Sequence, residues 1–222
     1  MLNNSIYEFL LELRENNNRD WFHANKAKYD QAKKDFEIFI DLCIAQIKQI
    51  DPDIAGLHAK DCIFRIFRDV RFSNDKRPYK TNFGAFLAKG GRKGRYGGYY
   101  IHIEPEQCFL GGGCYMPAPA ILKKIREEIF HNPERFKAII EDANFKRNYP
   151  ELYGDKLKTA PRGYPKDFKD IDLLNYKNYA VGKSIPDAII QSQAFQKEME
   201  QSFKALYPLN RFLNEIILDI EE

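Results

Sequence analysis

The sequence predicts an α+β fold in which a central antiparallel sheet of about four strands is flanked by N-terminal and C-terminal helices. The hydrophobic period changes along the chain. It is helical before residue 51, alternating between residues 62 and 115, and helical again after residue 118. The strand-like segments are separated by gaps too short for crossover helices. This spacing favours antiparallel pairing over a parallel sheet.

The N-terminal part is predicted to be helical. Residues 5–8, SIYE, match a capping box and would open a short helix. Asn18 or Asp20 can cap the next one. A long helix then carries one apolar stripe, formed by Tyr29, Ala32, Phe36, Phe39, Ile40, Cys43, Ile44 and Ile47.

Four segments of the middle part are predicted as strands: "CIFRIFRDVRF", "TNFGAFLA", "GGYYIHIE" and "QCFLGGGCY". In the first of these, residues 62–72, one face would hold Ile63, Arg65, Phe67, Asp69 and Arg71. The opposite, core face would hold Cys62, Phe64, Ile66, Val70 and Phe72, with Arg68 among them. A charged side chain on a core face must pair with a carboxylate, reach the edge of the sheet, or mark a bulge.

The last third of the chain is predicted to return to helices. They begin at "APAILKKIREEIF" and "NPERFKAIIED", and an irregular stretch rich in proline and aromatic residues runs from 144 to 186. Two C-terminal helices would follow, the first marked by Phe195, Met199, Phe203 and Leu206, and the second by Phe212, Leu213, Ile216, Ile217 and Ile220. We expect one domain over residues 1–222, because no segment has the composition of a linker.

Composition limits the class of protein. Apolar content of 44% and charged content of 30% are ordinary for a globular chain. No apolar run approaches the ~20 residues of a membrane span, so no membrane association is expected. Four scattered cysteines without a CxxC pair are typical of a reducing compartment, which predicts a cytoplasmic protein.

Positive charge is concentrated in one segment. Residues 65–95 hold ten basic and two acidic residues, a balance of +8, whereas the remainder holds 25 basic and 30 acidic residues, a balance of −5. Such asymmetry indicates an anionic partner. We therefore predict a ligand-binding cluster that includes Arg65, Arg68, Asp69, Arg71, Lys76, Arg77, Tyr79, Lys80, His102 and Glu104.

The chemistry of this cluster can be read in more than one way. Arginine presents a rigid fork of donors that suits phosphate or carboxylate groups. The alternative is an internal salt-bridge network that ties a loop to the sheet. His102 and Glu104 lie two apart on a predicted strand and would point the same way. With Asp69 they could act as an acid–base pair or ligate a metal, but no strong ligand motif is present, so neither metal nor cofactor is expected.

The central motif resembles a known family. The stretch "RIFRDVRFSNDKRPYKTNFG", with "NNNRDWF" before it and "APRGYPKD" and "IDLLNYKNY" after it, is similar to domain-of-unknown-function family 2461. This family is found in bacteria and fungi. The resemblance implies an intracellular single domain of mixed α and β structure, and it transfers no catalytic residue to this chain.

Three function classes remain, and we rank recognition of a small phosphate- or carboxylate-bearing ligand first. Nucleic-acid binding through residues 65–95 is the second, with Arg92, Lys93 and Arg95 near aromatic residues. Against it stands the net charge of only +3. The third is a structural or interaction protein. Whether the chain is an enzyme, and its oligomeric state, stay open at this stage.

Overall fold

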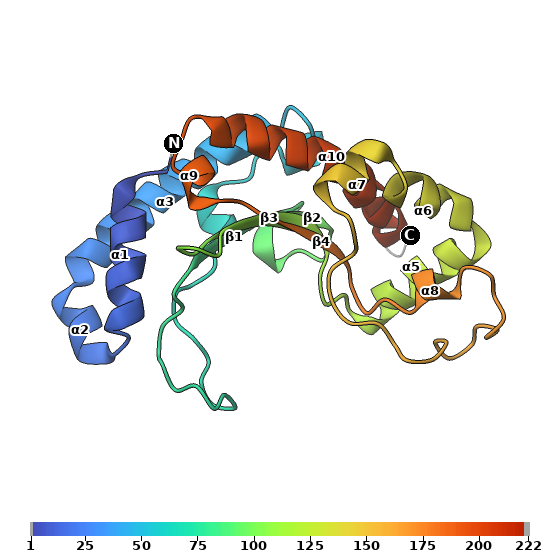
Figure 1. Cartoon of the computed structure of the whole chain (residues 1–222), viewed down its shortest axis with the longest axis horizontal. Coiled ribbons are helices and arrows are strands. Elements are labelled where there is room, and N and C mark those ends of the chain that lie inside the picture. Colours follow the sequence, from blue (N-terminus) through green and yellow to red (C-terminus); the bar gives the residue numbers. More distant parts are fainter. Residues whose placement is uncertain (1, 220–222) are drawn as a thin grey trace.

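A four-stranded antiparallel sheet in the order β1-β2-β3-β4 crosses the middle of the molecule in the computed structural model, which describes residues 2–219 (Figure 1). The strands are β1 Phe83–Leu87, β2 Gly98–Ile103, β3 Phe109–Cys114 and β4 Tyr179–Ser184. The helices of four residues or more are α1 Asn4–Glu15, α2 Arg19–Ala24, α3 Lys26–Ile47, α4 Ala59–Cys62, α5 Pro119–His131, α6 Pro133–Ile140, α7 Ala143–Asn148, α8 Ile171–Leu174, α9 Asp187–Ile190 and α10 Ala194–Leu218. The predicted α+β class and antiparallel sheet are confirmed.

The helices cover one face of the sheet. Figure 1 shows α3 and α10 along this side, with α1 and α2 at one end and α5–α8 at the other. Tyr99, Ile101 and Ile103 of β2 point toward these helices and are fully buried. None of the α-helices within residues 2–219 crosses the opposite side, which we call the open face.

The open face carries the alternate residues of the strands. The register pairs Gly84 of β1 with His102, His102 with Phe109, and Phe109 with Ser184 of β4. One step along, Phe86, Tyr100, Gly111 and Gly182 form the next row. Because partners in an antiparallel ladder point to the same side, all of these residues face away from the helical layer.

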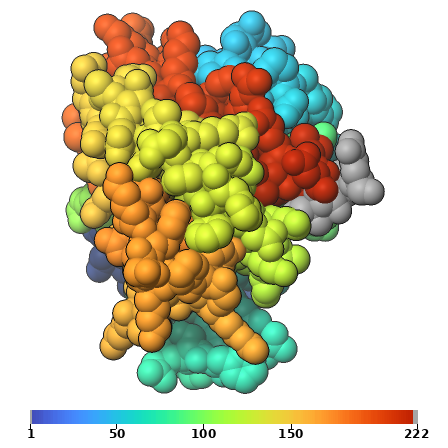
Figure 2. All heavy atoms as spheres, turned by 90° about the vertical axis from the view of Figure 1, so that its right-hand side faces the viewer, coloured from blue at the N-terminus to red at the C-terminus, as the bar shows by residue number. Residues whose placement is uncertain are grey.

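The predicted first strand, residues 62–72, is wrong. Residues 64–80 instead form an irregular two-limbed loop, which we call the arm. Ile63, directly before it, forms a single bridge with Ala85 of β1, and Phe67 and Tyr79 form a second bridge between the two limbs. Figure 1 shows the arm hanging beside the open face, and Figure 2 shows it projecting below the body. Two predicted core residues are consequently on the surface: Phe64 is 37% exposed and Phe72 is 96% exposed.

The fourth strand, β4, lies in the stretch that was predicted to be irregular. The two predicted C-terminal helices are one helix, α10, which continues through Pro208. It continues because the residues on both sides of the proline, Leu206, Leu209 and Leu213 among them, belong to one buried stripe. Ile220 lies outside the described residues.

The predicted helix N-termini are confirmed in part. The capping box at residues 5–8 is not formed, because Asn3 caps α1 by accepting a hydrogen bond from the Ser5 amide while the Ser5 hydroxyl donates to Asp35. Asn18 caps α2 as predicted. All four cysteines are free and buried. Among the described helices, none is both long and apolar enough to cross a membrane.

Candidate functional site

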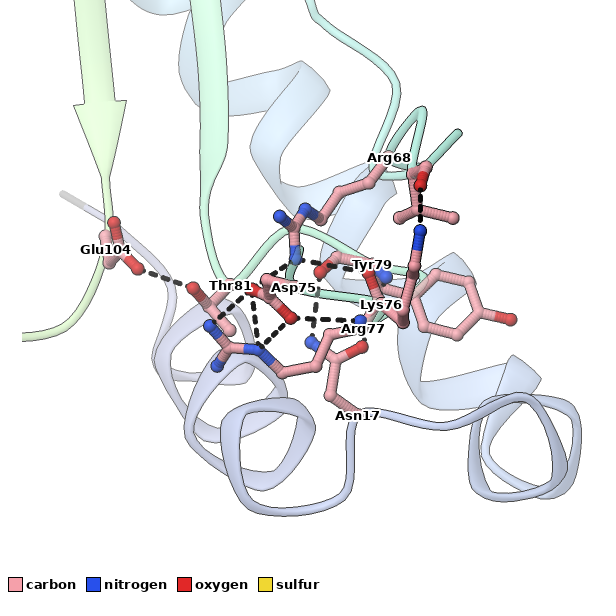
Figure 3. Close-up of polar contacts among 9 residues, drawn as sticks. Asn17, Arg68, Asp75, Lys76, Arg77, Tyr79, Thr81 and Glu104 are labelled. Carbon is pink, nitrogen blue, oxygen red and sulfur yellow. Dashed lines mark hydrogen bonds and ion pairs between the residues drawn. The ribbon is translucent and has the colours of Figure 1, made fainter. Parts of the chain in front are cut away.

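The base of the arm, residues 64–67 and 78–80, is fixed firmly to the N-terminal helices. The Tyr79 ring stacks on Phe22 with centroids 4.0 Å apart and is 4% exposed. The Asn17 side chain accepts from the Tyr79 amide at 3.1 Å and donates to the Tyr79 carbonyl at 3.0 Å (Figure 3). These contacts fix the position of the residues on either side of Tyr79, and they thereby set the direction in which the arm extends from the rest of the protein.

The tip of the arm, residues 68–77, neutralises most of its own charge. Figure 3 shows Asp75 between the guanidinium groups of Arg68 and Arg77, with closest contacts of 2.6 and 2.8 Å. Asp69 accepts two hydrogen bonds from the Arg71 side chain, at 3.0 and 2.7 Å. These contacts satisfy three of the six cations predicted to bind a ligand.

The pairing at the tip is electrostatically strong but exposed. Hydrogen bonds from the Arg77 side chain and amide, followed by that from Arg68, hold the pKa of Asp75 well below its usual value. Lys76 donates to the Val70 carbonyl at 3.1 Å and thereby joins the two limbs of the tip. Arg68, whose place on a core face was anomalous in the sequence, is accounted for by its carboxylate partner.

Two cations at the base of the arm differ from those at the tip. Among residues 2–219, neither the Arg65 guanidinium nor the Lys80 ammonium forms an ion pair or a hydrogen bond, although the Lys80 amide donates to the Ile66 carbonyl at 2.8 Å. The Lys80 ammonium lies 5.6 Å from the centre of the Phe64 ring. Burial lowers the pKa of Lys80, and the charge of Arg65 lowers it further. The charge of Arg65 also acts on Asp69, but that carboxylate is hydrogen-bonded to Arg71, so no carboxylate of the described residues is in direct contact with either cation at the base.

The Phe64 ring connects these cations to the open face. The Phe64 amide donates to the Gly84 carbonyl at 2.9 Å, which places residue 64 beside β1. A Cβ atom on Gly84 would lie 2.6 Å from the Tyr100 hydroxyl, so glycine at this position lets the Tyr100 ring lie across β1. The Phe64 and Tyr100 ring centroids are 6.2 Å apart.

A chain of hydrogen bonds runs along β2 on the open face. The Tyr100 hydroxyl lies 3.0 Å from His102 Nδ1, and His102 Nε2 lies 3.0 Å from Glu104. The Thr81 hydroxyl donates to the other Glu104 oxygen at 2.5 Å (Figure 3). An ionised carboxylate can only accept, so Nε2 carries the proton and Nδ1 of the neutral ring accepts from Tyr100.

The chain is partly shielded from solvent. The side chains of His102 and Glu104 are 14% and 20% exposed. The hydrogen bond from His102 is the largest of the effects that lower the pKa of Glu104. Burial, reinforced by the Glu104 charge, raises the pKa of Tyr100 to about 12. Tyr100 therefore stays protonated near neutral pH and can serve as a hydrogen-bond donor or a weak acid, with His102 as its partner.

The third residue considered for a metal, Asp69, is bonded to Arg71 in the tip of the arm. Over the described part of the chain, no group of three or more His, Cys, Asp or Glu side chains is arranged to hold a metal ion. His102 and Glu104 form a two-residue pair. In addition, His102 is hydrogen-bonded to Tyr100, and Glu104 accepts a hydrogen bond from Thr81.

The structure therefore divides the predicted residues into three groups. Arg68, Asp69, Arg71, Lys76 and Arg77 lie at the tip of the arm, Arg65, Tyr79 and Lys80 lie at its base, and His102 and Glu104 belong to the hydrogen-bond chain on the open face. Two residues of this region were not predicted: Phe64, which was expected in the core, and Thr81. The separation of Thr81 and Glu104 in the sequence does not indicate a contact between them, because the two residues come together only when β1 pairs with β2.

Comparisons with known proteins add a family and no named activity. The family model described as "Conserved hypothetical protein (DUF2461)" matches residues 5–212. Comparisons with curated proteins and with solved structures find no match. The matched range includes the arm, all four strands of the sheet and most of α10. The chain belongs to the DUF2461 family.

Proposed function

We propose that the protein binds a small anionic ligand, bearing phosphate or carboxylate, at the base of the arm beside the open face. The observation that carries this proposal is that Arg65 and Lys80 lack a carboxylate partner, whereas Arg68, Arg71 and Arg77 each have one. Like charges held close together destabilise the free protein, and an anion between them relieves this repulsion.

The surroundings of the two cations suit a bound anion. Lys80 is half-buried, so a charge-assisted hydrogen bond to it is less screened than one at the tip of the arm. Tyr100 borders the same region through its contact with Phe64. The Tyr100 proton is donated to His102, so toward a ligand Tyr100 presents an oxygen that accepts, which suits a hydroxyl or N–H group elsewhere on the ligand.

We also infer that the protein works in the cytoplasm. Its four cysteines are all free and buried. A reducing compartment keeps such thiols in this state.

The proposal is tested by thermal shift and titration calorimetry with inorganic phosphate, tripolyphosphate and citrate. A ligand that binds only the folded state stabilises it by RT ln(1 + [L]/Kd), about 2.7 kcal/mol at a hundredfold excess over Kd. We expect a rise in melting temperature for at least one anion, lost in Arg65→Ala and in Lys80→Met.

Arg71→Ala is the matched control, because it removes one arginine of the same arm that is exposed and paired with Asp69. This variant should keep the anion response. Equal losses in all three variants would mean that the arm attracts anions only through its total charge, and no response in the parent protein would refute the proposal.

A further inference from the structure

Gly182 of β4 is unlike every other glycine in the chain. All 13 glycines lie in the described residues, and each of the other twelve either has a positive φ or would place a Cβ atom within 3.4 Å of another atom. Gly182 has neither constraint. Its nearest neighbour would be Phe109 Cδ2 at 3.9 Å, an ordinary contact. The fold therefore gives no reason for glycine at this position.

A glycine in a strand is unfavourable unless something approaches its backbone closely. Gly182 and Ser184 are exposed on the open face, and Phe109 of β3 stands between them and the hydrogen-bond chain. The Phe109 ring stacks on His102 with centroids 4.6 Å apart and contacts Tyr100 at 5.4 Å. Among the described residues, only Phe109 comes within 4 Å of the place that a Cβ atom of residue 182 would occupy, so the missing side chain leaves room beside Phe109.

The position of this space sets the length of the ligand. Tyr100, Gly111 and Gly182 lie in one row across three strands. At ~4.8 Å between neighbouring strands, Gly182 is about 10 Å from the Tyr100 position. The Lys80 ammonium lies 5.6 Å from the Phe64 ring centre, and the Phe64 and Tyr100 ring centroids are 6.2 Å apart. A single phosphate or small dicarboxylate cannot reach both places.

We propose that the ligand is a nucleotide, with its base stacked above Gly182 beside Phe109 and its phosphate chain ending at Arg65 and Lys80. This inference rests on the proposed anion site and adds to it a second site, which binds the aromatic ring of the base. A flat ring fits against an exposed peptide backbone and the side of an aromatic residue. The Ser184 hydroxyl lies on the same face and can bond to the edge of the base. Two unpaired cations match a chain of phosphates.

The test compares ATP with tripolyphosphate, because the two carry similar phosphate chains and only ATP has a base and sugar. By calorimetry we expect the parent protein to bind ATP about tenfold or more tightly than tripolyphosphate. Gly182→Val should reduce the affinity for ATP to that for tripolyphosphate and leave tripolyphosphate binding unchanged. Phe109→Leu, which keeps apolar volume but removes the ring, should also weaken ATP alone.

The melting temperature distinguishes a loss of ligand affinity from a folding defect. Valine favours strands more than glycine does, so Gly182→Val should keep or raise the melting temperature while it lowers affinity. Gly182→Ala is the graded control, since its Cβ fits at 3.9 Å from Phe109, and it should lose less affinity than the valine variant.

The outcomes separate this inference from the anion site. Equal affinities for ATP and tripolyphosphate in the parent, or an ATP preference that survives Gly182→Val, would overturn the ring site and leave the anion site standing. Binding of neither compound would refute both. A single-stranded oligonucleotide of about 10 nucleotides tests whether the bound base belongs to a free nucleotide or to a nucleic-acid strand. If it binds more tightly than ATP and responds to Gly182→Val, the ring site holds a nucleotide of a strand. If it binds more weakly, the site holds a free nucleotide.

Discussion

The base and the tip of the arm contain the same kinds of residue in opposite settings. At the tip, arginines alternate with aspartates and pair with them in solvent, around a Phe72 side chain that is almost fully exposed. At the base, Tyr79 is buried, and within the described part of the chain neither Lys80 nor Arg65 forms an ion pair with a carboxylate. The arginines at the tip are paired with carboxylates, and the cations at the base are not.

This difference shows that the density of positive charge does not locate a binding site. Exposed ion pairs contribute little to stability, and the arginines within them have their donors occupied. An unpaired and half-buried cation is costly in the free protein, and for that reason it is the better indicator of function. Substitutions at the base should therefore affect the protein differently from substitutions at the tip.

The largest effect is expected at the anchor of the arm. Tyr79→Ala removes a ring stacked on Phe22, and truncation of a large buried aromatic costs about 3–5 kcal/mol of unfolding free energy. Phe72→Ala, at the tip, should change the unfolding free energy by less than about 0.5 kcal/mol. Urea unfolding measures both. Similar values for the two variants would remove the distinction between base and tip.

A smaller effect is expected from Glu104→Gln. Hydrogen bonds to a charged group contribute about 2 kcal/mol, and Glu104 accepts them from His102 and Thr81. Its pKa in the folded protein is below the ordinary 4.5, so its stabilisation is present above pH 4.5 and is lost as pH falls through the lowered value. The difference between parent and variant should therefore shrink in acid. The exposed Glu106→Gln serves as control, and a difference independent of pH would contradict the prediction.

Lys80→Met should have a modest effect of the opposite sign. Because the folded-state pKa of Lys80 is lowered, its charge destabilises the protein at neutral pH, and stability rises as pH increases from the lowered value toward the ordinary 10.5. The variant should melt at a higher temperature than the parent without ligand, and it should lose this pH dependence. Lys76→Met, at the tip, should show no gain. A Lys80→Met variant less stable than the parent would indicate a structural role.

The smallest effect is expected at the basic loop after β1. Arg92 donates to the Lys60 carbonyl at 2.7 Å, and it lines a pocket of about 280 Å³ together with Asp61. We expect weak nucleic-acid binding through this loop at physiological salt, and little change in its salt dependence in Arg92→Ala/Lys93→Ala. A tight complex whose salt dependence flattens in this double variant would favour the basic loop over the open face.

The parts of the fold that depend on local sequence were predictable. The alternation in β2 placed His102 and Glu104 on one face, and this geometry is confirmed. The segment 62–72 has the composition of a strand, but its polar residues pair with one another across a turn instead of extending the sheet. Tertiary packing overrode Pro208 as a helix break in α10.

Only part of the candidate site could be predicted from the sequence. The sequence gives the number of cations but not which of them an aspartate neutralises, since Asp75 reaches Arg68 only after the arm turns back. The open space above Gly182 depends on the pairing of β3 with β4, which are far apart in the chain. A lone glycine within "YAVGKS" is a local signal of close approach, and it acquires meaning only when its neighbours are known.

The separation of β3 from β4 also has a consequence for the order of folding. Hairpin-like connections join β1, β2 and β3, whereas residues 115–178 must be arranged before β4 can pair with β3. Closing a longer loop costs more entropy, so the three-stranded meander should form first and β4 should dock last. Amides of β4 should then exchange with solvent at a lower free energy than those of β2 in native-state hydrogen exchange. Uniform protection across the sheet would contradict this order. A chain that folds in this order acquires its open face late, because Gly182 arrives with the final strand.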